Sequence, residues 1–155
     1  MVPVPESVAT FLNSNRIAVV GVSHEPRDFS RAVFRKLAGR NGDVIPVNPN
    51  AEEIEGVRCY PDLASIPEPV AAVMVVTPPN AVSGIVEQAV QTGASRIWLH
   101  RSFGQGSVSD DAQRECAAKG IECIVGGCPL MYCQPVDLGH RCMRWWLSRS
   151  GRVPV

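Results

Sequence analysis

The sequence lacks several features that mark whole classes of protein. Its 155 residues carry no net charge, because 15 Lys and Arg balance 15 Asp and Glu. Its longest uninterrupted apolar run, Val70 to Val76, has seven residues, whereas a membrane-spanning helix needs roughly 18. These absences exclude a transmembrane helix and remove any overall electrostatic attraction to a membrane surface or to nucleic acid.

The first residues also lack the basic segment and apolar stretch of a secretory signal peptide. We therefore expect a cytoplasmic protein whose six cysteines are reduced, because that compartment keeps thiols free. A chain of this length can bury roughly 70% of the surface that its unfolded form exposes. The composition thus predicts one globular domain that needs no disulfides.

Close pairs of metal-ligating residues are missing as well. Cys123, Cys128, Cys133, His140 and Cys142 follow one another at spacings of five, five, seven and two, whereas zinc sites usually contain pairs such as C-x2-C. We predict no metal site. Cys128, on a loop after a predicted strand, is the best candidate for a reactive thiol, although the sequence identifies no base that would activate it.

What the sequence does contain is an alternation of two patterns. Short β-branched runs predict strands at 17–22, 43–47, 70–76, 96–100 and 121–126, and helical spacing and capping signals predict helices at 29–38, 82–90 and 109–119. Residues 6–13 favour a leading helix, and Cys59-Tyr60 a short edge strand. Pro46 has no N–H, so its strand should be paired on one side there or bulged.

This alternation predicts an α/β fold with a doubly wound, mostly parallel Rossmann-like sheet of five strands or slightly more. We expect a single domain over 1–155, with a core at 14–127 and a basic helical tail at 137–150. From residue 138 onward the chain has four Arg and no acid. We expect this tail to pack on the domain with its basic side, which includes Arg141 and Arg144, in solvent. It offers too little charge for nucleic acid, whereas Trp145 and Trp146 could form a homodimer contact.

In such sheets ligands bind beyond the carboxyl ends of the strands. The first of these loops, 21–30, leads into a helix whose free N–H groups and positive dipole end favour phosphate. There Gly21 would let the backbone approach, and Ser23, Arg27 and Ser30 would add donors. We predict a phosphate-binding loop.

A dinucleotide site would need G-x-G-x-x-G in this loop and an acid after the second strand. The chain offers only Gly21 and, after the second strand, Asn48. This disfavours NAD(P), although an NAD(P)-dependent oxidoreductase stays open as an alternative.

Four segments, GVSHEPRDFS at 21–30, PVNPN at 46–50, EIEGVRCYPDL at 53–63 and VVTPP at 75–79, together resemble the CoA-binding domain family. That domain occurs in the succinyl-CoA synthetase alpha subunit, in ADP-forming acyl-CoA synthetases and as small stand-alone proteins. The segment after the fifth strand, GCPLMY at 127–132, is similar to the end of the small stand-alone members.

The resemblance implies that coenzyme A or an acyl-CoA is the ligand. Gly21, Ser23, Arg27 and Ser30 would meet its diphosphate, Asn48 and Pro49 would line the nucleotide end, and Val76, Thr77 and Pro78 would contact adenosine or pantetheine. His100 stands where stand-alone members often have Gln. The full predicted set is Gly21, Val22, Ser23, Arg27, Ser30, Asn48, Pro49, Val76, Thr77, Pro78 and His100.

The resemblance carries over no catalytic residue, because the synthetases need a phosphohistidine domain and an ATP-grasp domain that 155 residues cannot hold. We therefore expect a CoA-binding module that is non-catalytic by itself, with a protein partner possible. A thiol enzyme that acts on CoA derivatives through Cys128 is the other alternative. Taken singly, each motif could also be an ordinary turn or helix cap.

Overall fold

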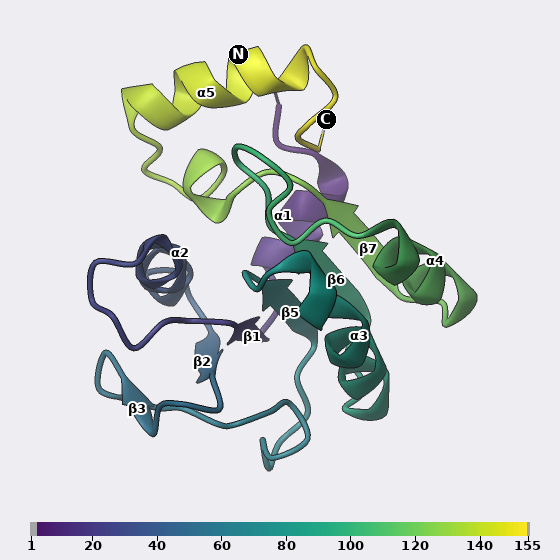
Figure 1. Cartoon of the computed structure of the whole chain (residues 1–155). Coiled ribbons are helices and arrows are strands. Elements are labelled where there is room, and N and C mark those ends of the chain that lie inside the picture. The colour runs from purple at the N-terminus through teal and green to yellow at the C-terminus, as the bar shows by residue number, and fades with distance from the viewer. Residues whose placement is uncertain (1–2, 155) are drawn as a thin grey trace.

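A computed structural model, which describes residues 3–154, contains a five-stranded sheet with helices on both faces (Figure 1). The strand order is β2-β1-β5-β6-β7, and every neighbouring pair is parallel. The strands are β1 (Arg16–Val20), β2 (Asp43–Val47), β5 (Ala72–Val75), β6 (Arg96–Leu99) and β7 (Glu122–Val125). The predicted α/β Rossmann-like fold in a single domain is confirmed. All the strands except β2 are shorter than predicted, because the apolar runs continue into buried loops beyond the paired residues.

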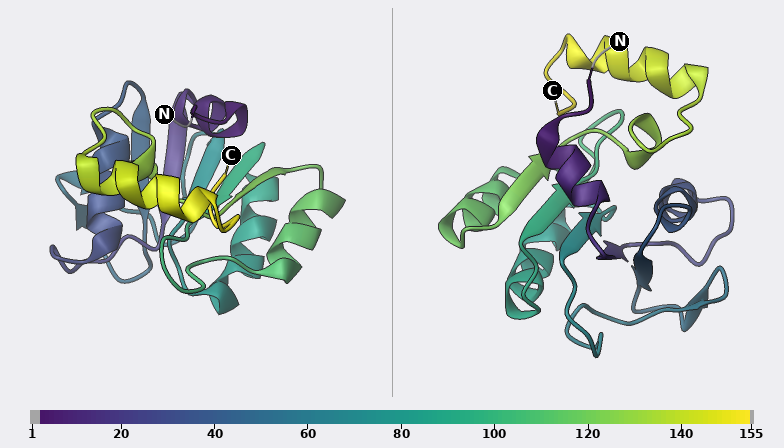
Figure 2. Two further views of the ribbon diagram at one scale, coloured as in Figure 1. Left: turned by 90° about the horizontal axis from the view of Figure 1, so that it is seen from above. Right: turned by 180° about the vertical axis from the view of Figure 1, so that it is seen from behind.

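Alternate strand residues separate the core into two layers. Ile17 and Val19 join the cluster on one face of the sheet, and Ala18 and Val20 join the cluster on the other, as the two-residue period of a strand requires. The first face is covered by α1 (Glu6–Leu12), α2 (Phe29–Ala38), the 3-10 turn η2 (Pro129–Met131) and α5 (Leu138–Ser148). The second is covered by α3 (Val82–Gln91), which follows the 3-10 turn η1 (Pro79–Ala81), and by α4 (Asp110–Ala118) (Figure 2).

Edge strand β2 accommodates Pro46 as expected. The Pro46 carbonyl faces away from β1 and accepts the Tyr60 N–H at 3.1 Å. The nitrogen of Pro46 faces the same way, so its missing N–H removes no hydrogen bond between β2 and β1. The predicted edge strand at Cys59-Tyr60 is only an isolated parallel bridge between Val47 and Tyr60. The pairing prediction is confirmed, whereas the extra strand is reduced to a single bridge.

A two-stranded hairpin precedes this bridge and was not predicted. It pairs β3 (Glu53–Ile54) with β4 (Val57–Arg58). Its turn residues, Glu55 and Gly56, both have positive φ, at 52° and 76°, as tight hairpin turns require. The hairpin places the Glu55 carboxylate beside α2.

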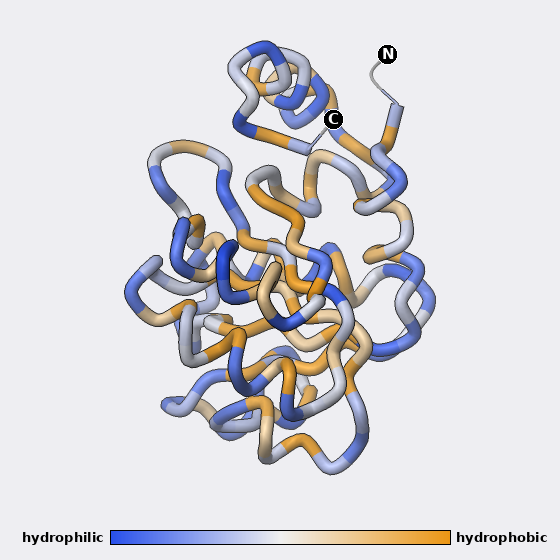
Figure 3. Tube along the Cα trace, turned by 90° about the vertical axis from the view of Figure 1, so that its right-hand side faces the viewer, coloured by the Kyte–Doolittle hydropathy of each residue, from blue (hydrophilic) through white to orange (hydrophobic). Residues whose placement is uncertain are grey.

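The tail helix α5 packs differently from the prediction. Leu147 is fully buried and Arg144 is only 9% exposed, whereas Trp145 and Trp146 are 51% and 60% exposed. The prediction of a solvated basic side was therefore wrong for Arg144, because its guanidinium lies over the Tyr132 ring, 4.4 Å from the ring centroid, and donates to the Pro3 carbonyl. In Figure 3 hydrophobic and hydrophilic residues alternate along α5, at the top. Within residues 3–154, no helix has the length and apolar character needed to span a bilayer.

Candidate functional site

Strand order reverses between β1 and β5, and the loops that follow these two strands touch. From β1 the chain moves outward to β2, whereas β5, β6 and β7 continue on the other side of β1. Gly21 follows β1 with φ +98°, and a Cβ built there would lie 2.7 Å from Thr77 Cγ2 and 3.1 Å from the Thr77 backbone nitrogen. Only glycine suits this position. Ligands of open α/β sheets bind at such a switch point.

Three buried polar atoms at this edge of the sheet have no hydrogen-bond partner among residues 3–154: Thr77 Oγ1, His100 Nε2 and Arg101 Nε. Arg101 also donates to the Arg152 carbonyl through Nη2, whereas the Thr77 hydroxyl is the only polar atom of its side chain. Thr77 and His100 follow the neighbouring strands β5 and β6. The loop that follows His100 is held against Thr77, because the Ser107 hydroxyl donates to the Thr77 carbonyl at 2.5 Å. A buried polar group without a partner costs about 1–3 kcal/mol. A bound molecule could satisfy Thr77 and His100.

The His100 imidazole is neutral at physiological pH. Its side chain is buried, and this burial lowers its pKa to about 4. Its ring lies 5.2 Å, between centroids, from the Phe29 ring, which is 55% exposed. An apolar ring and a neutral imidazole therefore stand together at the beginning of α2.

The loop 21–30 is held by its own hydrogen bonds. The Ser23 N–H donates to Ser30 Oγ at 2.9 Å, and the Ser30 hydroxyl donates to Asp28 Oδ1 at 2.5 Å. Asp28 also caps α2 by accepting the Ser30 N–H at 2.8 Å. Ser30 thus orders the loop, and an anion at this helix end would meet the Asp28 carboxylate. In the predicted phosphate-binding loop, the exposed Arg27 is the residue able to offset that charge.

Asn48 connects the loop after β2 to the loop after β1. Its Nδ2 donates to the Val22 carbonyl at 2.7 Å, and its Oδ1 accepts the Asn50 N–H at 2.8 Å. Val76 is buried, whereas Pro49 and Pro78 are exposed. The predicted site residues therefore follow β1, β2, β5 and β6 at one edge of the sheet, with Gly21 in contact with Thr77 and Asn48 with Val22.

An ion-pair network that sequence reasoning missed supports the first loop. Arg31, only 8% exposed, donates to Glu55 Oε1 at 3.0 and 2.8 Å and to the carbonyls of Ser23 and His24 at 3.3 and 3.2 Å. Arg35 donates to the same carboxylate at 2.7 Å. The guanidinium groups of Arg35 and then Arg31 hold the pKa of Glu55 below its usual range. The sequence signal for this network was a Glu-Gly turn at 55–56 together with two arginines, Arg31 and Arg35, on one face of α2.

We expect an Arg31→Met variant to loosen the loop 21–30. The carbonyls of Ser23 and His24 lose a charged donor, and the domain should lose about 1–3 kcal/mol of unfolding free energy. Urea unfolding measures the loss, and hydrogen exchange at residues 23–25 locates it. Arg35→Met is the matched control, since Arg35 is exposed and should matter less. Equal losses in both variants would contradict this role.

Cys128 is a poor nucleophile in this structure. It is 4% exposed, and burial raises the pKa of its thiol to about 11. The reactive thiolate is therefore scarce at neutral pH, which argues against a thiol enzyme that uses Cys128. In the part of the chain that the structure describes, no three His, Cys, Asp or Glu side chains gather as metal ligands.

Comparisons with known proteins point to one family. A family model described as a CoA binding domain matches residues 15–134. The chain is 32% identical over 115 residues to the uncharacterized protein YneT of Bacillus subtilis, an alignment that covers 74% of this chain and 82% of YneT. It is 30% identical over 106 residues to the alpha subunit of an ADP-forming acetate–CoA ligase II of Pyrococcus furiosus, covering 68% of this chain but 23% of that subunit. A solved hypothetical protein from Pyrococcus horikoshii superposes with a TM-score of 0.74 at 29% identity, covering 80% and 85% of the two chains.

Proposed function

Because the chain belongs to the family of CoA-binding domains, we propose that it binds coenzyme A or an acyl-CoA at the carboxyl edge of its sheet and catalyses no reaction by itself. The observation that carries the location is the pair of buried, unpartnered atoms Thr77 Oγ1 and His100 Nε2 beside the switch point. Both lie among the residues that the sequence resemblance assigned to the ligand.

The residues at this edge suit different parts of CoA. Gly21 lets the first loop lie close to the loop that contains Thr77, and Arg27 supplies a guanidinium for the diphosphate. Thr77 and His100 supply polar contacts, and Phe29 supplies an exposed ring on which adenine could stack. When bound, CoA would bring the thiol or thioester, and this chain would bind and orient it.

The chain aligns with 23% of the ligase alpha subunit, so the whole ligase's activity is not carried over to it. The protonated Cys128 thiol gives no nucleophile. We further propose a cytoplasmic location, where all six cysteines would remain thiols.

Native mass spectrometry of the purified protein tests the ligand. We expect a one-to-one adduct with CoA or an acyl-CoA and no comparable adduct with NAD or NADP. Dinucleotide binding without CoA binding would refute the proposal and would favour an oxidoreductase.

A Thr77→Val variant tests the location. Valine keeps the shape of threonine but removes the unpartnered hydroxyl, so the free domain should keep or gain stability, by about 1 kcal/mol at most. CoA binding should weaken about fivefold, because one hydrogen bond is worth about 1 kcal/mol. Calorimetry measures affinity, and urea unfolding measures stability. Thr92→Val, at the far end of α3, is the control; unchanged affinity in Thr77→Val would place the ligand elsewhere.

A further inference from the structure

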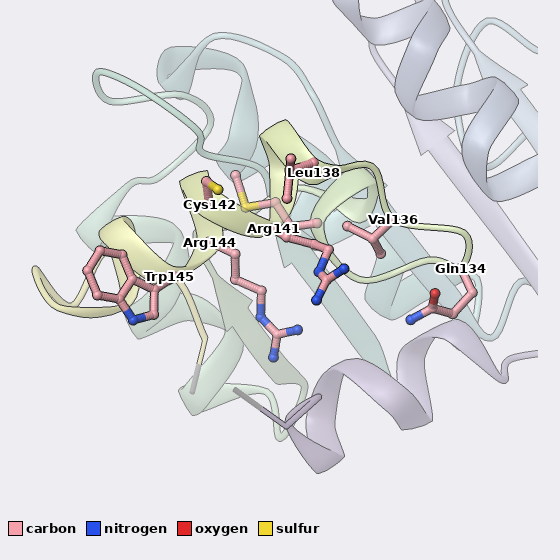
Figure 4. A pocket seen from close by; sticks show the side chains of 8 residues that line it. Gln134, Val136, Leu138, Arg141, Cys142, Arg144 and Trp145 are labelled. Carbon is pink, nitrogen blue, oxygen red and sulfur yellow. The ribbon is translucent and has the colours of Figure 1, made fainter. Parts of the chain in front are cut away.

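A cavity lies on the outer side of the first layer, away from the predicted CoA residues. Its volume is about 390 Å³, and it lies between α5 and the segment that joins η2 to α5. None of the eleven residues predicted for CoA lines it. Its lining residues are Met131, Gln134, Val136, Leu138, Arg141, Cys142, Arg144 and Trp145 (Figure 4).

The cavity contains a buried positive charge without a carboxylate partner. Arg144 is only 9% exposed, its Nε has no hydrogen-bond partner, and no salt bridge joins it to an acid among residues 3–154. Its other contacts are the Pro3 carbonyl and the face of Tyr132. Buried charges are normally paired. Among the arginines with an unpartnered Nε, Arg144 is the one that lines this cavity, where an anion could pair with it.

Neighbouring groups strengthen the positive character of the cavity. Arg141 lies one helical turn before Arg144, and Figure 4 shows the two guanidinium groups extending from α5 in the same direction. The Gln134 side chain adds an amide at the end of the cavity nearer Arg141. No acid occurs among the eight described residues that line it. The cavity therefore has two cations and no negative charge.

The remaining walls are apolar. Met131 is fully buried, and Val136, Leu138, Trp145 and the Cys142 side chain complete the lining. A ligand that fills the cavity must bury an apolar body against these side chains and present an anionic end to Arg144. Of the two cations only Arg144 is buried, because Arg141 is exposed to solvent that screens its charge. The buried guanidinium balances one negative charge, and its planar fork matches a carboxylate.

We propose that this cavity binds a monocarboxylate with an apolar body, of the size of a medium-chain fatty acid, through Arg144 and Arg141. The Arg144 guanidinium donates to one carboxylate oxygen, and Arg141 contacts the other oxygen from the rim. The apolar chain lies against Met131, Val136 and Leu138. The site is separate from the proposed CoA site and does not depend on it.

Sodium octanoate is the probe, measured by calorimetry on the full chain. We expect one-to-one binding, with the neutral octanamide and inorganic phosphate each binding at least about tenfold more weakly because one lacks the charge and the other the apolar body. Octanoate should also slow maleimide labelling of Cys142, which is exposed and lines the cavity. Absence of octanoate binding, or equal binding of octanamide or phosphate, would overturn the proposal.

Two variants assign the charge contacts. Arg144→Lys keeps the buried charge and the fold but loses the fork, so octanoate affinity should fall about tenfold. Arg141→Gln, at an exposed position, should lower it about threefold. Arg114→Gln on α4 removes the same charge far from the cavity and should change nothing. Unchanged octanoate affinity in both Arg144→Lys and Arg141→Gln would overturn the assignment.

A competition experiment separates the two sites. Saturating CoA should leave octanoate affinity unchanged, and Thr77→Val should affect CoA alone. Displacement of octanoate by CoA would show that the cavity belongs to the CoA site, and would overturn this inference without touching the proposed function. Loss of CoA binding with octanoate binding intact would refute the proposed function alone.

Discussion

A Gly21→Val variant should bind no measurable CoA and should lose about 3 kcal/mol of unfolding free energy. Backbone strain and steric crowding both lower the unfolding free energy. The backbone φ of +98° is unfavourable for an L-residue by about 1–2 kcal/mol. In addition, the new Cβ would lie 2.7 Å from Thr77 Cγ2 and 3.1 Å from its backbone nitrogen, and crowding in a packed site costs about 1–3 kcal/mol.

CoA binding suffers because relief of this clash must displace Thr77. The loop after β5 moves, or the loop after β1 moves, and either movement separates groups that the ligand needs together. Calorimetry with CoA and urea unfolding measure the two losses.

Gly93→Val is the matched control for backbone strain. Gly93 has φ +80°, but a Cβ there would have open space and would lie at the end of α3. This variant should lose stability through strain alone and keep its CoA affinity. Normal CoA affinity in Gly21→Val would show that the switch point between β1 and β5 is not the binding site.

The second large effect is a loss of stability in mild acid caused by His100. The unfolded chain takes up a proton on this imidazole below its ordinary pKa of 6.5, whereas the folded domain takes it up only near pH 4. Between these values the unfolded state binds more protons, so the unfolding free energy falls as pH falls. At 1.36 kcal/mol per pKa unit, the full loss is about 3 kcal/mol. Above pH 6.5 this group contributes no pH dependence.

A His100→Gln variant should remove this slope, because glutamine does not titrate and still offers hydrogen-bonding atoms. Urea unfolding at several pH values between 7 and 4 compares the variant with the wild-type domain. A wild-type curve that is flat across this window would show that His100 is hydrated and titrates normally.

The Glu55 carboxylate acts in a lower window and serves as an internal reference. Its pKa is lowered by Arg35 and Arg31 from 4.5, so its stabilising contribution is present above 4.5 and is lost as pH falls through the lowered value. That loss should remain in His100→Gln, which separates the two groups.

Local patterns predicted the backbone well, and the reasons are local. The helix at 109–119 was recognisable because its cap, acidic first turn and final glycine lie within a dozen residues, and Ser109 does cap it by accepting the Ala112 N–H. The strands were recognisable because strands buried on both faces are apolar at nearly every position.

The side-chain environments that depend on distant residues were not predictable. Arg144 is buried because of Pro3 and Tyr132, and Arg31 because of a hairpin 24 residues away. Ser30 was predicted to meet the diphosphate, but its hydroxyl donates a hydrogen bond to the neighbouring Asp28. A helical wheel shows on which face of a helix a residue lies, but it does not show which distant residue packs against that face.

The Arg144–Tyr132 stack also brings the two ends of the described chain together. Arg144 holds the Pro3 carbonyl, and the Tyr132 hydroxyl donates to the Pro154 carbonyl at 3.1 Å. A domain whose ends are neighbours can be inserted into a longer polypeptide, or its ends joined and a new break opened in a surface loop, without disturbing the sheet. The same layout would let evolution move this unit between stand-alone and multidomain proteins with the carboxyl edge of its sheet unchanged.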